Sequence, residues 1–201
     1  DARIIDMKQE LRAGNDLDLS RELEEGIRDA ILDKKQSILF LNRRGNSRYL
    51  VCMDCGDVPQ CPRCSVHLTY HSAGRRLMCH YCGFTAPAHA RCGKCGGAMK
   101  AIGSGTQKIE QELKALFPDT EVLRMDADTV PAAGGHEAML KKFREQQIPI
   151  LLGTQMVAKG LDFPSVTLVG VIDADMSLYV DNFRAAETTF SLITQVVGRS
   201  G

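Results

Sequence analysis

The chain carries, at Cys52–Cys95, the stretch CMDCGDVPQCPRCSVHLTYHSAGRRLMCHYCGFTAPAHARCGKC, which holds all eight of its cysteines. The cysteines form four C-x-x-C pairs: Cys52/Cys55, Cys61/Cys64, Cys79/Cys82 and Cys92/Cys95. A C-x-x-C turn brings two sulfurs to one metal, and two such turns complete a tetrahedral shell. The spacing therefore predicts a module with two structural Zn²⁺ sites, each held by four cysteines.

The C-x-x-C pairs can be divided between two sites in two ways. A hairpin of Val66–His71 and Arg76–Met78 would nest a site of the second and third pairs inside a site of the first and fourth. A cross-braced module would instead join the first pair to the third and the second to the fourth. The hairpin favours nesting, and cross-bracing stays open. Gly follows Cys55, Cys82 and Cys95, where a residue with positive φ turns backbone N–H groups toward sulfur.

Other cysteine chemistry fits the pattern less well. Ferredoxin-type iron–sulfur clusters use different spacings, and thioredoxin-like proteins need one reactive pair at the start of a helix. A catalytic zinc keeps an open coordination position, whereas four thiolates close the shell. The same stretch contains His67, His71, His80 and His89. Because the cysteines already fill both sites, we interpret these histidines as surface or packing residues.

Strand-like and helix-like segments alternate on both sides of the cysteines. Apolar runs predict strands at Ser37–Leu41, Glu121–Met125, Ile148–Leu152 and Val166–Ile172. Helical spacing of apolar residues predicts a helix capped by Ser20 and helices at Thr106–Phe117, Glu137–Glu145 and Arg184–Val197. This alternation predicts the α/β class, a parallel sheet with helices on both faces. Residues 1–51 and 97–201 would form one α/β domain, and residues 52–96 the inserted zinc module.

Composition excludes several classes of protein. Lys+Arg 25 balance Asp+Glu 25, and 44% of the residues are hydrophobic, as in a globular rather than a disordered chain. No apolar run approaches the ~20 residues of a membrane span, and the N-terminal DARIIDMKQE has no apolar signal-peptide core. We therefore expect a cytoplasmic protein without a membrane partner. Because the net charge is zero, an argument for nucleic-acid binding must come from motifs.

Ligands of open parallel sheets bind beyond the carboxyl ends of the strands. There the chain reads GTQMVAKGLDFP (Gly153–Pro164), with small residues, a hydroxyl, an amide, a Lys and an Asp suited to phosphate contacts. The last helix ends in QVVGRSG (Gln195–Gly201), whose Gln and Arg also suit phosphate. No segment reads G-x-x-x-x-G-K-[ST], so these residues hold no phosphate loop. Asp173 and Asp175, at a strand end, are interpreted as solvated or capping residues.

Several segments, in this order, resemble one family. They are FLNRRG (Phe40–Gly45), the four cysteine pairs, GTQ (Gly105–Gln107), RMDADT (Arg124–Thr129), LLGTQMVAKGLDFP (Leu151–Pro164), DNFRAAE (Asp181–Glu187) and TQVVGRSG (Thr194–Gly201). They are similar to the PriA (primosomal protein N′) family, superfamily 2 DNA helicases that restart stalled bacterial replication forks. The resemblance covers essentially the whole chain. It implies a RecA-like helicase lobe 2 interrupted by the zinc module, with nested zinc sites.

The resemblance also implies roles for individual residues, through helicase motif V in LLGTQMVAKGLDFP and motif VI in TQVVGRSG. The implied DNA-binding residues are Thr154, Gln155, Arg43 and Arg44. For Arg43 and Arg44 the other interpretation is that they are solvated surface charges. The implied nucleotide-binding residues, at the interface between lobes, are Lys159, Gly160 and Asp162. The implied catalytic residues, facing the phosphates of ATP, are Gln195 and Arg199.

The same resemblance implies that the chain is a fragment. The family continues past Gly201 with a further Arg, and its first lobe carries the phosphate loop and metal-binding box. We expect the fragment alone to be ATPase-inactive, and its parent to use ATP and Mg²⁺ to move 3′ to 5′ on DNA. The implied partners are forked or single-stranded DNA, single-strand-binding protein and other primosome proteins. The alternative is a non-catalytic zinc-ribbon module that binds nucleic acid or protein.

Overall fold

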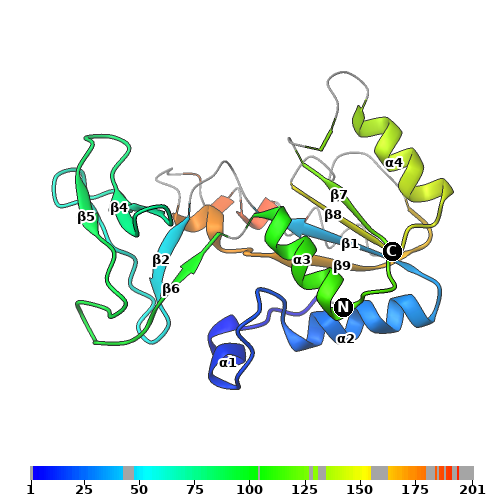
Figure 1. The fold of residues 1–201 in the computed structure, drawn as a ribbon, viewed down its shortest axis with the longest axis horizontal. Helices are drawn as coiled ribbons and strands as arrows, with labels where there is room; N and C mark the ends of the chain where they lie inside the picture. Colours follow the sequence, from blue (N-terminus) through cyan, green and yellow to red (C-terminus); the bar gives the residue numbers. More distant parts are fainter. Residues whose placement is uncertain are drawn as a thin grey trace.

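The computed structural model describes most of the chain (Figure 1). The described residues are 2–42, 48–103, 105–126, 129–130, 135–154, 163–179, 184, 186–187, 189–191 and 194. All statements below concern these residues.

The centre of the molecule is a four-stranded parallel sheet in the order β7-β8-β1-β9. Its strands are β1 (Gln36–Leu41), β7 (Val122–Met125), β8 (Ile150–Thr154) and β9 (Val166–Ile172). The central strand β1 is buried at every position, which explains its continuous apolar run. The four predicted strands are therefore confirmed. The largest boundary shift is in β8, which begins at Ile150, and Ile148 packs in the core just ahead of the strand.

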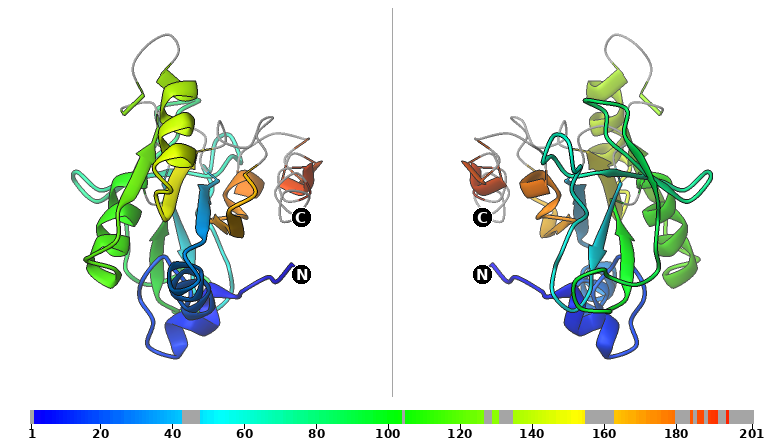
Figure 2. Two further views of the ribbon diagram at one scale, coloured as in Figure 1. Left: turned by 90° about the vertical axis from the view of Figure 1, so that its right-hand side faces the viewer. Right: turned by 90° about the vertical axis from the view of Figure 1, so that its left-hand side faces the viewer.

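Helices cover both faces of this sheet, as predicted (Figures 1 and 2). Alternate residues of β1 point to opposite faces, so Ile38 and Phe40 pack in one core cluster and Leu39 and Leu41 in another. The first cluster contains residues of α4 (Gly135–Glu145). The second contains residues of α2 (Arg21–Leu32) and α3 (Thr106–Leu116). A short helix, α1 (Met7–Arg12), precedes α2.

The ends of the helices follow local sequence signals. Ser20 caps α2 as predicted, because its Oγ accepts a hydrogen bond from the Leu23 N–H at 3.2 Å. A 3₁₀ helix, η2 (Met176–Tyr179), follows β9. The helix predicted at Arg184–Val197 lies partly outside the described residues, and those described within it include helical positions at 186–187 and 189–191. Among the described helices, none combines the length and apolar character needed to cross a membrane.

The cysteine-rich stretch forms two small sheets of its own, at one end of the molecule (Figure 1). One is an antiparallel ribbon of β2 (Tyr49–Cys52) and β6 (Met99–Ile102), which enters and leaves the module. The other joins β3 (Thr69–His71), β4 (Arg76–Met78) and β5 (Thr85–Pro87). The β3–β4 hairpin is the one predicted from sequence. The β5 strand was missed because a three-residue Thr-Ala-Pro segment gives no apolar alternation.

Candidate metal centres and the carboxyl edge of the sheet

The four C-x-x-C pairs fold into four turns with the same hydrogen bonds. In each, the N–H of the first cysteine donates to the carbonyl five residues later, at 2.8 Å: Cys52 to Asp57, Cys61 to Val66, Cys79 to Phe84 and Cys92 to Gly97. The N–H four residues later donates back to the first cysteine, at 2.9–3.0 Å: Gly56 to Cys52, Ser65 to Cys61, Gly83 to Cys79 and Gly96 to Cys92. The repeated geometry explains why each turn presents both its sulfurs on one side.

The residue after the second cysteine of each pair has a positive φ. Three of these residues are glycines, Gly56, Gly83 and Gly96, with φ of 76°, 72° and 75°. The fourth is Ser65, with φ of 57°. Sequence reasoning found the three glycines and missed Ser65, because a left-handed non-glycine residue carries no sequence signal beyond its place in the repeat.

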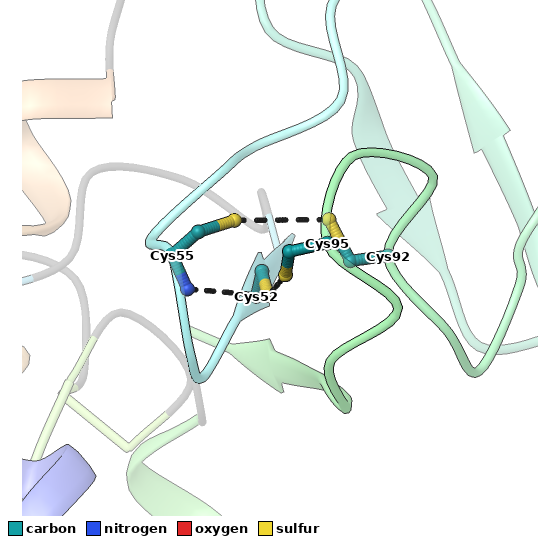
Figure 3. Close-up of side chains that lie close together, drawn as sticks. All are labelled: Cys52, Cys55, Cys92 and Cys95. Carbon is teal, nitrogen blue, oxygen red and sulfur yellow. Dashed lines mark hydrogen bonds between the residues drawn. The ribbon is translucent and has the colours of Figure 1, made fainter.

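The eight sulfurs gather into two clusters in the nested arrangement. One contains Cys52, Cys55, Cys92 and Cys95 (Figure 3), and the other Cys61, Cys64, Cys79 and Cys82. Within each cluster all ligand atoms lie within 4.8 Å of one another. Close sulfur pairs are separated by 3.4 Å (Cys52–Cys95), 3.8 Å (Cys55–Cys92) and 3.6 Å (Cys61–Cys82). The cross-braced grouping does not occur.

These separations suit zinc and not disulfides. Zn–S bonds of about 2.3 Å in a tetrahedron place sulfurs about 3.8 Å apart, whereas a disulfide needs about 2.05 Å. Backbone N–H groups also point at the sulfurs: Cys55 to Cys52 Sγ at 3.5 Å, and Lys94 to Cys92 Sγ and Gly97 to Cys95 Sγ at 3.4 Å. Such donors stabilise thiolates around a metal. The donor set therefore fits two closed Zn²⁺ sites.

The thiol pKa values show why a cation is needed to ionise a whole cluster. The backbone N–H of Cys55 lowers the pKa of Cys52 to about 6, and that of Cys82 lowers the pKa of Cys79 to about 7. In contrast, hydrogen bonding to Cys82 raises the pKa of Cys64 to about 12. At Cys95 the Gly97 N–H lowers the pKa, but neighbouring thiols outweigh it and raise the value to about 12. A dication would remove this competition between adjacent thiolates.

Each site has a buried side and an exposed side. The first cysteine of every pair, at 52, 61, 79 and 92, is buried, whereas Cys55, Cys82 and Cys95 are exposed. The buried sulfurs of Cys61 and Cys79 pack with Leu50, Leu68 and Leu77 in a small core. A core of this size leaves the module dependent on its metal sites for stability.

The nucleotide- and DNA-binding residues implied by the resemblance lie in segments that the structure describes only in part. Thr154 ends β8 and lies in register with Leu41, the last residue of β1. Next to them, Asn42 is buried and donates from its N–H to the Ile172 carbonyl at 3.0 Å and from Nδ2 to the Ala174 carbonyl at 2.7 Å. The remaining implied residues, Arg43, Arg44, Gln155, Lys159, Gly160, Asp162, Gln195 and Arg199, lie outside the described residues.

Two motifs that are distant in sequence meet at the start of α3. The Thr106 hydroxyl of GTQ donates a hydrogen bond to Asp126 of RMDADT. The Thr129 N–H donates to Asp126 Oδ1 at 3.0 Å, and Arg124 Nε lies 3.2 Å from Asp126 Oδ2. Sequence reasoning named both motifs and missed their contact, because nothing in either segment indicates the other. This network closes one wall of a cleft of about 730 Å³, whose other wall is the β3–β4 hairpin.

Known proteins share both parts of this architecture. The family model for the helicase conserved C-terminal domain matches residues 101–201, half of the chain, and that for the PriA DNA helicase Cys-rich region (CRR) domain matches residues 61–87. Replication restart protein PriA of Bacillus subtilis (strain 168) is 50% identical over 199 residues, which are 98% of this chain and 25% of that protein. The chain belongs to the PriA helicase family.

Other relatives agree. Replication restart protein PriA of Synechocystis sp. is 42% identical over 204 residues, 99% of this chain and 24% of that protein. The protein of the same name from Haemophilus influenzae is 40% identical over 200 residues, 98% of this chain and 27% of that protein. The chain thus spans about a quarter of the length of these curated relatives. It contains a PriA-type helicase C-terminal domain and zinc ribbon.

Proposed function

We propose that the chain is the second motor lobe, with its zinc module, of an ATP-dependent 3′–5′ DNA helicase that recognises stalled or branched replication forks and starts primosome assembly. One observation carries the proposal. Two four-cysteine clusters are inserted in the sequence between β1 and α3 of a helicase C-terminal domain, in a chain similar to replication restart proteins. Residues 52–96 are then an inserted module, and residues 1–51 and 97–201 the lobe.

The chemistry proposed at the carboxyl edge of the sheet is phosphoryl transfer. Gln195 and Arg199 would face the phosphates of ATP, and Lys159, Gly160 and Asp162 would line the nucleotide at the lobe interface. Thr154, Gln155, Arg43 and Arg44 would hold the DNA backbone. Positioned cations stabilise the charge that develops on the transferred phosphoryl group. The location of Thr154 and Asn42 at this edge supports a ligand site there.

The two Zn²⁺ ions are proposed to be structural. Cys52, Cys55, Cys92 and Cys95 would hold one, and Cys61, Cys64, Cys79 and Cys82 the other. Four thiolates leave no coordination position for a substrate, so the metal supplies folding energy and no reaction step.

ATP and Mg²⁺ belong to the longer protein in this proposal. These residues contain no phosphate loop, so we expect no ATP hydrolysis by them alone. The partners we propose are forked or single-stranded DNA, single-strand-binding protein and other primosome proteins, in the cytoplasm.

The test is ATP hydrolysis by the longer protein with and without forked DNA, beside its Arg199→Ala variant. Fork-stimulated hydrolysis that falls at least about a hundredfold in the variant supports a motor lobe. Arginines that stabilise the transition state of phosphoryl transfer raise kcat by a factor of about 10³ or more. The control is Arg28→Ala, on the exposed side of α2, which should retain full activity. Hydrolysis indifferent to DNA and to Arg199 would favour the alternative, a non-catalytic zinc-ribbon module on an α/β scaffold.

A further inference from the structure

A cleft of about 730 Å³ lies where the zinc module meets the lobe. One wall belongs to the start of β2 and the β3–β4 hairpin, with Arg48, His71 and Arg76. The other wall is the N-terminus of α3 and the end of β7, with Thr106, Gln107 and Arg124. A space of this volume is in the range of small-molecule sites, so it admits a nucleotide-sized segment of a single strand.

The positive charge in this cleft comes from two arginines without counter-ions. Arg124 pairs with Glu110 at 3.1 Å and with Asp126 at 3.2 Å, and Lys108 pairs with Asp18 at 2.6 Å. Arg48 and Arg76 form no ion pair with any residue in the described part of the chain. Asp126, the acid in the lining, is already engaged by Arg124, Thr106 and Thr129. The cleft therefore retains an excess of cationic groups.

Backbone pairing holds these cationic groups together. The Tyr70 N–H donates to the Arg48 carbonyl at 2.6 Å, which joins β3 to the residue preceding β2. His71, next to Tyr70, is the register partner of Arg76 across the hairpin. The Nε2 atom of His71 is buried and has no hydrogen-bond partner among the described residues. Arg48, next to β2, thus lies beside His71 of β3 and Arg76 of β4, and all three residues line the cleft.

The facing wall adds backbone donors. The N-cap residue of α3 is Gly105, which has no side chain. The first N–H groups of the helix therefore receive no hydrogen bond from a capping side chain. The helix dipole favours an anion at this end. A phosphate between the two walls would be bound by arginines from one side and by helix N–H groups from the other.

The stretch that contains the hairpin and the N-terminus of α3 is free of acids. No Asp or Glu occurs between Asp57 and Glu110. Lys and Arg in the same interval stand at 63, 75, 76, 91, 94, 100 and 108. The interval is therefore positively charged, although the net charge of the whole chain is zero. A local excess of Lys and Arg is typical of a surface that binds a polyanion.

We infer that this cleft binds a backbone phosphate of single-stranded DNA, shared between Arg48 and Arg76 of the zinc module and the N-terminus of α3. The inference rests on the proposed function, and it names where the zinc module touches the strand. A phosphate bound by both walls would couple the hairpin to the lobe.

The test uses the zinc-loaded chain and a fluorescein-labelled dT15 oligonucleotide, with fluorescence anisotropy over a series of salt concentrations. Arg48→Gln/Arg76→Gln should weaken binding at least about tenfold, as expected for two charge-assisted contacts. It should also reduce the slope of log K against log[salt] by about 0.7, because one phosphate contact is lost. Unchanged zinc content and circular dichroism show that the variant is folded.

The charge-matched control is Arg75→Gln/Arg91→Gln, since both side chains are exposed in the same acid-free interval and neither lines the cleft. It should weaken binding less than about threefold, through the general field alone. Equal losses in the two double variants would overturn the cleft site and leave DNA binding by the chain intact. Displacement of dT15 by ATP as effectively as by unlabelled dT15 would assign the cleft to a free nucleotide and also overturn it. Lack of binding by the unmodified chain would instead count against the proposed DNA substrate itself.

Discussion

Leu39 of β1 and Gly170 of β9 are register partners in the parallel sheet, and the Leu39 side chain fills the space where any other residue at 170 would place its Cβ. A Cβ there would lie 2.9 Å from Leu39 Cδ2 and 2.8 Å from Cδ1 of Leu23 on α2. The missing side chain at 170 therefore lets α2 pack directly on β9 and its neighbour β1.

Replacing Gly170 by Ala should lower the free energy of unfolding of the lobe by about 1–3 kcal/mol, because the added methyl displaces Leu23 and Leu39. Urea unfolding followed by the helical circular-dichroism signal measures this. Gly93→Ala is the control, since a Cβ at 93 meets nothing within 4 Å. The control should change stability by less than about 0.5 kcal/mol. Equal effects at the two positions would contradict the packing argument.

Replacing Cys79 by Ser should remove one of the two zinc sites and unfold the β3–β4 hairpin, while the lobe stays folded. The loss follows because zinc binding stabilises a site by on the order of 10 kcal/mol. Metal analysis should show one zinc lost, and amide exchange should become fast at Thr69–Met78. The paired variant Cys92→Ser should also lose one zinc but keep the hairpin protected, because its cluster lies outside the hairpin. Protection of the hairpin in both variants would argue against metal-dependent folding.

Replacing Ser65 by Gly should strengthen the inner zinc site. Ser65 has φ of 57°, a conformation that costs a non-glycine residue about 1 kcal/mol and glycine almost nothing. We expect roughly a fivefold slower transfer of zinc to a competing chelator. Ser65→Ala tests the side chain alone and should leave the rate near that of the unmodified chain. If both variants accelerate zinc loss, the hydroxyl and not the backbone governs this turn.

Replacing Gln36 by Leu should destabilise the lobe by about 2–4 kcal/mol. The Gln36 side chain is buried, and its Nε2 donates to the carbonyls of Phe143 and Ile148 at 2.9 Å each. Leucine removes both hydrogen bonds: the Phe143 carbonyl keeps the Ile148 N–H at 3.2 Å, whereas the Ile148 carbonyl loses its side-chain donor. Gln146→Leu, at the exposed position that follows α4, should change stability by less than about 0.5 kcal/mol in the same urea titration. A Gln36 variant as stable as this control would show that water replaces the amide.

The zinc clusters were predictable because their signals are local. A C-x-x-C turn places two sulfurs together within a few residues, so the spacing alone identified two four-cysteine sites, and the predicted hairpin favoured the nested grouping that the structure has. The strand at Ser37–Leu41 was predictable for a similar reason, since a strand buried on both faces needs an unbroken apolar run. The strand at Val166–Ile172 was predictable from its apolar, β-branched residues, although it lies at the edge of the sheet and is only partly buried.

The short elements were less accessible to sequence reasoning. The strand at Thr85–Pro87 exists because β4 offers it an open edge, and its three residues carry no pattern of their own. Ser65 has its left-handed backbone because the turn around Cys61 and Cys64 requires it, in a place where the other turns use Gly.

What the sequence by itself determined is thus the chemistry held within single segments: the cysteine pairs, the buried strands, the Ser20 cap and the absence of acids between Asp57 and Glu110. What only the tertiary structure decided is which segments meet. Thr106 reaches Asp126, and Arg48 lies across a cleft from α3, because the β2–β6 ribbon and the parallel sheet bring together residues remote along the chain. Such contacts depend on long-range packing, which local spacing does not encode.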